Sequence, residues 1–464
     1  MKKLDLQPTD NNIRNTFIRD SIGRNIDLVN FIKIIDSIDE SYSIALDSYW
    51  GSGKTFFVKQ VKMILDAKTE KSYGAVEGKE QVLDTWEKIS KNMQLKKHVP
   101  IYYDAWQNDC DDDPIYSLVY QMILDTENNK GIKDKINKED IIAFAGKIAG
   151  VISGIDPNEI AASLKKDDFL KTLRERKDIY LHIEEYIDKL LPSGCDRLLI
   201  IIDELDRCNP EFAVKLLERI KHYFNNDRIT FVFSVNLAEL QHTIKHHYGA
   251  DFNASRYLDR FFDLPIKLSP INMDKYLESQ GIYDRNYVFD DTMKAVIKKY
   301  NLQIREISRY IVIAKYIVGN QAYIDSYKIN NSRNVIIHLV IPIVAALIIT
   351  DNKKFNDFIN GRDSSPLTEF YDEEKTIENV MHYLSFLFSE SERDAFNSAK
   401  AIVQTPNYLQ GLLGRFYNAL FYRTGEVKIG ICSIGNEDRN YFKKIISLLS
   451  DNTIKMIDTN EIST

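Results

Sequence analysis

The chain has 464 residues, more than one compact core usually contains, which favours two or three domains. Hydrophobic residues make up 44% and charged residues 28%, which is typical of a folded globular protein and not of an intrinsically disordered chain. The formal net charge is −7, which excludes a general attraction to nucleic-acid phosphates.

The N-terminal segment, residues 1–15, carries two lysines with no apolar run behind them and does not match a secretory signal. The four cysteines show neither a CxxC pair nor a metal-ligand spacing, which is typical of free thiols in a reducing compartment. They are Cys110, Cys195, Cys208 and Cys432. We therefore expect a cytoplasmic protein without disulfides or a zinc site.

The first predicted elements surround a small-residue turn. Residues 22–38 have the apolar spacing of an amphipathic helix, and the short apolar run 43–46 predicts a strand. Helical periodicity returns at 56–65. The segment 47–55 is therefore expected to connect a strand to a helix.

That turn matches the Walker A phosphate-binding pattern except at its first position, where Ser48 replaces glycine. Glycines at 51 and 53 let backbone amides converge on phosphate oxygens, and the next helix adds its positive N-terminal end. Lys54 would contact the β- and γ-phosphates, and the Thr55 hydroxyl would ligate magnesium. A chance glycine-rich turn is the alternative, disfavoured by the strand-to-helix setting. The expected nucleotide-binding residues are Ser48, Trp50, Gly51, Ser52, Gly53, Lys54 and Thr55.

A second strand is predicted at 98–103, followed by the polar sequence DAWQN and a helical pattern at 115–124. From about 107 to 192, charged residues, an apolar patch at 141–154 and a helical segment at 169–191 indicate a helical insertion. The apolar patch is too short to span a membrane.

Dense apolar runs at 198–202 and 229–235 predict strands buried on both faces of a parallel sheet, with a helix at 210–224 between them. Acidic residues follow the first run directly, at the strand edge where open α/β sheets bind ligands. This is a Walker B arrangement. Asp203 would hold magnesium, Glu204 would orient or deprotonate water, and Asp206 is the competing base. A solvated charged turn is the alternative for this segment alone.

Two neighbouring residues have open roles. Arg207 is expected to pair with Asp206 or Asp203 rather than face a neighbouring site. Asn236, which follows the strand 229–235, would position water or touch the γ-phosphate, or else cap the helix 237–244.

After residue 270 most segments have helical patterns. The most apolar stretch, 335–350, is shorter than the roughly 20 residues a membrane helix needs, so a buried helix is favoured over membrane contact. From residue 351 onward no second active site is evident.

Several of these segments together resemble the KAP family of P-loop NTPases, which is related to the AAA+ and STAND ATPases. The segments are Asp20–Arg24, Trp50–Thr55, Tyr103–Trp106, Ile202–Cys208 with Pro210-Glu211, and Tyr257–Pro265. The family usually has glycine where Ser48 stands and often a second aspartate where Glu204 stands. Many relatives carry membrane helices between the two Walker motifs.

The resemblance implies an α/β three-layer αβα sandwich with a parallel central sheet, binding ATP and Mg²⁺. It places the NTPase domain at 1–270, a helical lid-like domain at 271–350 and a C-terminal helical region at 351–464. Arg305, in the segment 302–309, would be a sensor-like arginine near the nucleotide, unless it is an ordinary exposed arginine.

Arg256 and Arg260 are candidates for a finger that acts across a subunit interface, against structural pairing with Asp259 or Asp263. We expect ATP hydrolysis by a homo-oligomer or with a partner protein, in a switch or assembly role and, by resemblance, in anti-phage defence. The alternatives are a scaffold with little turnover and a nucleic-acid-stimulated ATPase. Basic stretches at 91–98 and 294–299 are more typical of solvated faces, and any membrane contact is expected to be peripheral.

Overall fold

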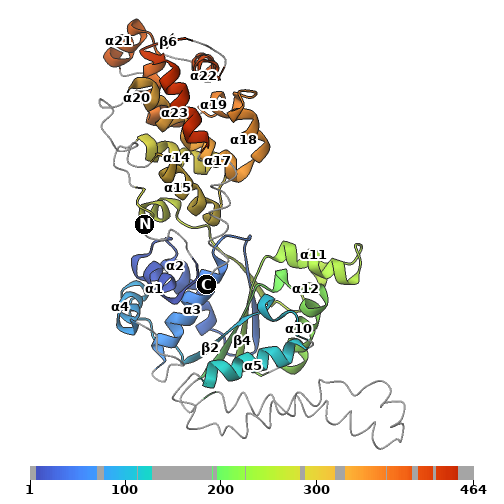
Figure 1. Cartoon of the computed structure of the whole chain (residues 1–464). Coiled ribbons are helices and arrows are strands. Elements are labelled where there is room, and N and C mark those ends of the chain that lie inside the picture. Colours follow the sequence, from blue (N-terminus) through green and yellow to red (C-terminus); the bar gives the residue numbers. More distant parts are fainter. Residues whose placement is uncertain are drawn as a thin grey trace, which may run out of the picture. The chain divides into compact units, whose positions relative to one another are not determined.

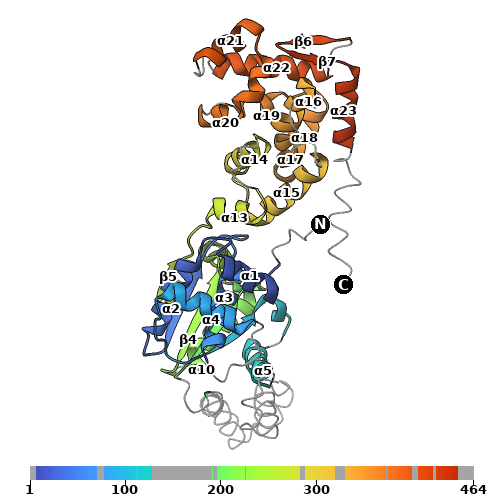
Figure 2. The ribbon, with the colours of Figure 1, turned by 90° about the vertical axis from the view of Figure 1, so that its left-hand side faces the viewer.

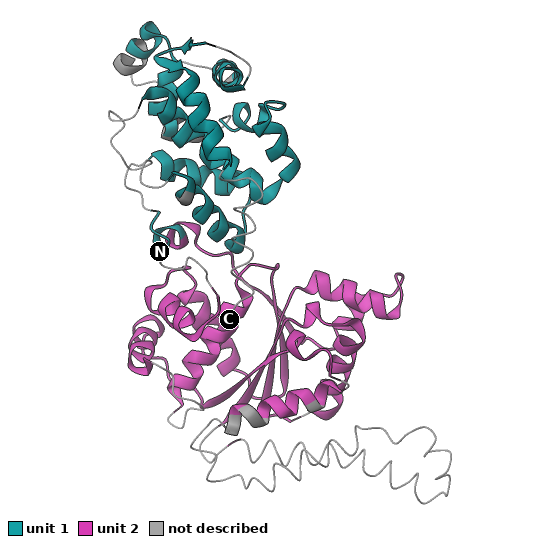
Figure 3. Ribbon diagram, viewed as in Figure 1, with its two compact units in different colours: residues 1–6, 277–464 teal, residues 7–276 magenta. Residues whose placement is uncertain are grey.

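The computed structural model describes residues 7–69, 78–111, 113–127, 191, 196–224, 226–282, 288–318, 330–371, 374–399, 406–421 and 425–447. The described residues form two compact units, 7–276 and 277–447, shown in separate colours in Figure 3. The boundary falls within helix α13 (Met273–Ser279). The predicted apolar patch at 141–154 and all but the last residue of the helical segment 169–191 lie outside the described residues.

The first unit is built on one five-stranded sheet whose strand order is β2-β3-β4-β1-β5, with every neighbouring pair parallel. Its strands are β1 (Tyr42–Asp47), β2 (His98–Asp104), β3 (Arg197–Asp203), β4 (Ile229–Val235) and β5 (Leu264–Lys267). All residues of β3 and β4 are buried, as expected for continuous apolar strands inside a parallel sheet.

Helices cover both faces of this sheet because successive strand residues point to opposite sides. Leu198, Ile200 and Ile202 enter one hydrophobic core, while Leu199 and Ile201 enter the other. One face is covered by α2 (Asn25–Asp36), α3 (Lys54–Lys68) and α4 (Lys79–Ser90). The other is covered by α5 (Pro114–Glu127), α10 (Pro210–Tyr223), α11 (Leu237–Tyr248) and α12 (Ala254–Leu258). Figures 1 and 2 show these layers, which confirm the predicted three-layer αβα sandwich.

The N-terminal helix differs from its prediction. Instead of one helix from residue 22, α1 (Asp10–Arg19) ends at Asp20 in the left-handed conformation, and α2 begins at Asn25. Gly23 lies between them with φ +67°, and a side chain there would overlap the Cβ atom of Asn272. Strand β5 was not predicted, because only alternate residues of its short sequence are partly buried.

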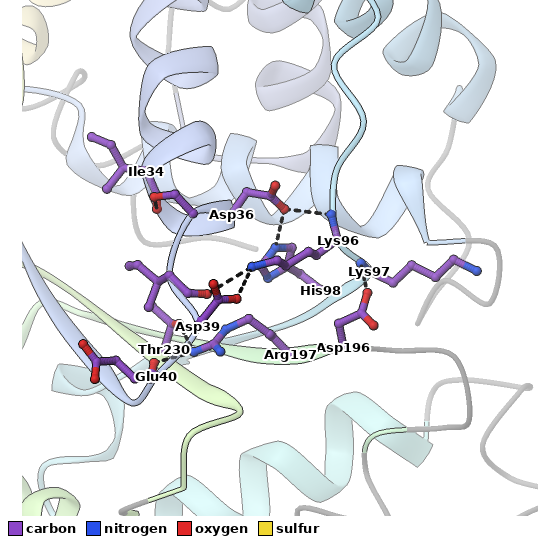
Figure 4. Close-up of polar contacts among 12 residues, drawn as sticks. Ile34, Asp36, Asp39, Glu40, Lys96, Lys97, His98, Asp196, Arg197 and Thr230 are labelled. Atoms are coloured by element: carbon purple, nitrogen blue, oxygen red, sulfur yellow. Dashed lines mark hydrogen bonds and ion pairs between the residues drawn. The ribbon is translucent and has the colours of Figure 1, made fainter.

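A polar network fixes the amino edge of the sheet, opposite the end where the acidic residues lie (Figure 4). Asp36, at the end of α2, lies 3.0 Å from the ring Nε2 of His98 and accepts a hydrogen bond from the Lys96 backbone. Burial opposes ionisation of Asp36, but these contacts outweigh it and lower the pKa of the carboxyl. Arg197 donates to the carbonyl of Glu40 and, at 3.1 Å, to the hydroxyl of Thr230. These contacts hold the starts of β2 and β3 to α2 and β4.

The second unit is mainly helical. It contains α14 (Val288–Lys299), α15 (Ile304–Val318), α16 (Asn331–Val335), α17 (Ile341–Thr350), α18 (Asn352–Ile359), α19 (Ser365–Thr368), α20 (Glu374–Leu384), α21 (Glu390–Ala399), α22 (Pro406–Phe421) and α23 (Asn436–Ser447). A short antiparallel hairpin, β6 (Val427–Ile429) and β7 (Cys432–Ile434), was not predicted. Residues on both sides of position 351 belong to this one unit.

The apolar stretch predicted at 335–350 forms part of a longer continuous helix, residues 331–350. A π-helical turn (Ile336–Val340) joins α16 to α17, and Pro342 is the second residue of α17. Proline lacks the amide hydrogen and clashes with the carbonyl four residues before it, which explains the widened turn. Within the described residues this helix alone has the length and apolar composition of a membrane span, but 78% of its apolar window is buried inside the unit. Core helices of soluble proteins share that property.

Candidate functional site

The glycine-bearing loop connects β1 to α3, in the setting that the sequence predicted. Gly51 and Gly53 adopt φ +77° and +88°, which a side chain would disfavour. Ser48 is not among the described residues with positive φ, so serine fits at the first position of the pattern. Its amide donates to the carbonyl of Val235 at 3.1 Å, which ties the loop to the end of β4.

Arg24 supports this loop through a hydrogen bond to its backbone. Its side chain is buried and donates to the carbonyl of Ser52 at 2.9 Å and to the carbonyl of Ser269. Burial lowers the pKa of the guanidinium to about 10, partly offset by Asp27. The sequence indicates Arg24 only as part of a motif, because its two carbonyl partners are far away along the chain.

Lys54 is the first residue of α3 and is buried. Its ammonium donates to the carbonyls of Ser48, at 2.6 Å, and Tyr49, at 3.2 Å. Burial lowers the pKa of the ammonium, while the acidic groups led by Asp206 and Glu204 oppose that shift. The positive charge is thus held inside the loop and beside the acidic strand end.

The acidic residues lie at the carboxyl edge of the sheet. Parallel register places Asp203 beside Asp104 of β2 and Ser234 of β4. Asp203 is fully buried and accepts a hydrogen bond of 2.9 Å from the hydroxyl of Tyr102. Burial, followed by the charge of Asp203, raises the pKa of Tyr102, so the phenol remains a donor. Tyr102 is not predicted as a site residue from the sequence, because only the β2–β3 pairing brings it to Asp203.

Glu204 links the two motifs. One carboxylate oxygen lies 3.5 Å from the Thr55 hydroxyl and the other forms an ion pair with Arg207. Its backbone has φ +61°, a strained conformation for a residue with a side chain. Burial, followed by the charge of Asp203, raises the pKa of this carboxyl to about 7. The Thr55 contact shows that the loop and the acidic strand end form one site.

Asp206 accepts a hydrogen bond of 2.6 Å from the indole nitrogen of Trp50. The aspartate is buried, and burial raises the pKa of its carboxyl. The competing candidate base is therefore already bound to a residue of the glycine-bearing loop.

Arg207 does not have the partner that was expected. It pairs with Glu204, not with Asp206 or Asp203. Glu204, in the left-handed conformation, directly precedes a short 3-10 turn that ends at Arg207, so the two side chains are close enough to pair. Its guanidinium carbon also lies 5.7 Å from the Trp50 ring centroid and 5.6 Å from that of Trp106.

Asn236 caps α11. Its side-chain oxygen accepts from the amides of Ala238, at 3.2 Å, and Glu239, at 3.4 Å. The residue lies at the same edge of the sheet as the acids and is buried. The structure therefore shows the capping role, and a contact with water or phosphate stays a prediction.

The other three arginines predicted for the site have no contact with it within the described residues. Arg256 and Arg260 are exposed, and within the described residues neither forms an ion pair, so pairing with Asp259 or Asp263 is not seen. Arg305 is exposed near the start of α15 in the second unit. Their predicted roles stay predictions.

The oxygen donors at the site suit magnesium. The Thr55 hydroxyl and the Asp203 carboxylate are hard ligands, and Mg²⁺ is usually held by one or two such groups together with substrate phosphates. No cluster of three or more His, Cys, Asp or Glu able to hold a metal ion occurs in the described part of the chain. The donor set fits a metal that arrives with a nucleotide.

A parallel three-layer sheet, a glycine-bearing loop opening a helix, and an acidic strand end beside that loop define the class of P-loop nucleotide-binding proteins. The sequence matches the model of the KAP family P-loop domain over residues 28–317, more than half of the 464-residue chain. The chain belongs to the KAP family, as its motifs predicted.

No curated protein matches the sequence. Among solved structures, a structure of the ORC2 protein of Aeropyrum pernix in ADPNP–ADP complexes is 11% identical, with a TM-score of 0.30. That match covers 88% of this chain and 93% of the other. At this similarity we transfer nothing from it.

Proposed function

We propose that the chain binds ATP with Mg²⁺ and hydrolyses it to ADP and phosphate. The observation that carries the proposal is the contact between Thr55 and Glu204, because it joins a phosphate-binding loop to an acidic strand end in one site. Membership of the KAP family supports nucleotide binding. Hydrolysis of the bound nucleotide is the further step that we propose.

The roles follow from position and chemistry. Lys54 would exchange the carbonyls of Ser48 and Tyr49 for phosphate oxygens. Thr55 and Asp203 would hold the magnesium ion, which neutralises charge on the phosphates when bound. Water attacks the γ-phosphorus, Glu204 orients that water and takes its proton, and the bond to the β–γ bridging oxygen breaks as ADP leaves.

Two substitutions separate binding from chemistry. Lys54→Ala removes the phosphate charge partner, so ATP affinity measured by calorimetry is expected to fall at least about tenfold. Glu204→Gln keeps the shape of the side chain but cannot accept a proton, so it is expected to bind ATP and release phosphate about a hundredfold more slowly. Wild-type affinity in Lys54→Ala, or wild-type turnover in Glu204→Gln, would contradict these roles.

A nucleotide-dependent scaffold with little turnover is the second candidate. It is favoured by the ion pair that occupies Glu204. Tight ATP binding by the wild-type protein without phosphate release, at every protein concentration, would select this alternative.

We further propose a switch or assembly role in an oligomer, with Arg256 or Arg260 reaching a neighbour's nucleotide. Both side chains are exposed, which such a role requires. The mass of the assembly with and without ATP tests this, and a monomer under both conditions would reject it. A role in anti-phage defence rests on family resemblance alone. It predicts that phage form fewer plaques on cells that produce the wild-type protein than on cells that produce Lys54→Ala.

A further inference from the structure

The contacts of Glu204 limit how its carboxylate can act as the base that activates water. Both of its carboxylate oxygens are engaged, one by Thr55 at 3.5 Å and the other by Arg207. A base must bring an oxygen within hydrogen-bond reach of the attacking water. Here the carboxylate is directed to a guanidinium and to the residue expected to ligate magnesium.

Arg207 is held in this position by two indole rings. Its guanidinium lies against Trp50, from the glycine-bearing loop, and Trp106, which follows β2. A cation over an aromatic face gains about 0.5–1 kcal/mol at exposed sites, and more when water is excluded. Trp50 and Trp106 remain 46% and 52% exposed, so the slot that they form is open to solvent.

Trp50 also couples the slot to the phosphate loop. Its indole nitrogen donates to Asp206 at 2.6 Å, while its ring lies against the guanidinium of Arg207, the next residue in the chain after Asp206. Movement of the loop around phosphate would therefore change the surface on which Arg207 rests. The position of the guanidinium therefore depends on three contacts. One is the ion pair with Glu204, and the other two are with the rings of Trp50 and Trp106.

We propose that Arg207 is a positioning residue that holds Glu204 in a resting orientation, with Trp50 and Trp106 as its slot, and that loss of this hold raises the rate of ATP hydrolysis. The inference rests on the proposed hydrolysis and names a regulation of the same site. Trp106 contacts Arg207, but within the described residues it has no polar or ring contact with the phosphate-binding loop or with Glu204.

The test is steady-state phosphate release with saturating Mg-ATP. Arg207→Gln is expected to raise kcat about tenfold, equivalent to a restraint of about 1.4 kcal/mol, while KM for ATP changes less than about twofold. Arg207→Lys keeps a positive charge near Glu204 and should stay close to the wild type. Trp106→Leu removes one face of the slot and should raise kcat less than Arg207→Gln does.

Two controls isolate the effect. The double variant Glu204→Gln with Arg207→Gln should be as slow as Glu204→Gln alone, because Arg207 acts through Glu204. Arg219 also combines a carboxylate, Asp113 at 3.1 Å, with an aromatic face, Tyr223, but lies on α10 outside the site. Arg219→Gln should therefore leave kcat unchanged.

Unchanged or lower kcat in Arg207→Gln, in a preparation that binds ATP as the wild type does, would overturn the restraint and leave hydrolysis standing. If neither the wild type nor any variant releases phosphate, the proposed hydrolysis is itself rejected, and this inference with it.

Discussion

At the scale of single residues, the contacts that define the site join positions far apart in the sequence. Tyr102 reaches Asp203, Trp50 reaches Asp206, and Arg24 reaches Ser52 and Ser269. Each is a polar group that is buried or half-buried beside a partner. Removal of one partner leaves the other without a hydrogen bond and lowers the stability of the folded protein. Individual substitutions should therefore report on single contacts.

Arg24→Ala is expected to lower the free energy of unfolding of the first unit by about 2–3 kcal/mol, because two carbonyls lose a charged donor. ATP affinity should also fall, since Ser52 belongs to the phosphate loop. Denaturant unfolding and calorimetric titration measure the two effects. Lys275→Ala, which breaks an exposed pair with Asp20, is the control and should cost less than about 1 kcal/mol. Unchanged ATP affinity in Arg24→Ala would show that it does not support the loop.

His338 predicts a pH dependence for the second unit. It is buried in the π-helical turn, stacks on Tyr383 with ring centroids 4.2 Å apart, and has no hydrogen-bond partner on either ring nitrogen within the described residues. Burial, then the charge of His382, lowers its pKa from 6.5 to about 3. The folded state therefore keeps the ring neutral while the unfolded chain protonates it.

Because the folded pKa is depressed, this contribution to stability is complete above pH 6.5 and is lost as pH falls. Between pH 7 and pH 5 the second unit should lose about 2 kcal/mol from this residue. His338→Phe keeps a ring against Tyr383 and should remove that part of the pH dependence, whereas the exposed His246→Gln should not. Equal pH dependence in wild type and His338→Phe would show that another group titrates.

At the scale of elements, predictions held where a strand or helix had a continuous pattern and a large buried face. Strands β1 to β4 and helices α3, α10 and α11 were predicted from apolar runs and periodicity. Strand β5 and the hairpin β6–β7 were missed, since each is short and pairs with only one strand. Their stability comes from neighbours rather than from their own residues.

The hairpin turn gives a sharp test. Gly430 has φ +59°, and a Cβ there would overlap the carbonyl oxygen of Phe388. Gly430→Ala is therefore expected to destabilise the second unit by about 2 kcal/mol or more. Gly411→Ala, on α22, meets nothing within 4 Å and should instead stabilise by about 0.5–1 kcal/mol. Thermal unfolding of both variants makes the comparison, and equal effects would mean that the turn is not constrained.

At the scale of the whole molecule, the chain has two compact units, and each contains many buried apolar side chains. The candidate site lies entirely in the first of them. Calorimetry is expected to show two transitions, and Mg-ATP at about a hundred times its Kd should stabilise only the first unit, by about 2.7 kcal/mol. Lys54→Ala should abolish the shift. A single transition, or an equal shift of both, would show that the units unfold together.

The sequence by itself determined the class of site and the central sheet, because a glycine-bearing loop, an acidic strand end and continuous apolar strands are local patterns with local physical causes. Ser48 could be placed directly after a strand in this way, Lys54 and Thr55 at the start of the next helix, and Asp203 and Glu204 at the end of another strand. Only the tertiary structure decided which groups touch across those ends. The pairing of Arg207 with Glu204, the hydrogen bond from Tyr102 and the support from Arg24 depend on strand order and on a left-handed turn, and no local pattern encodes either one.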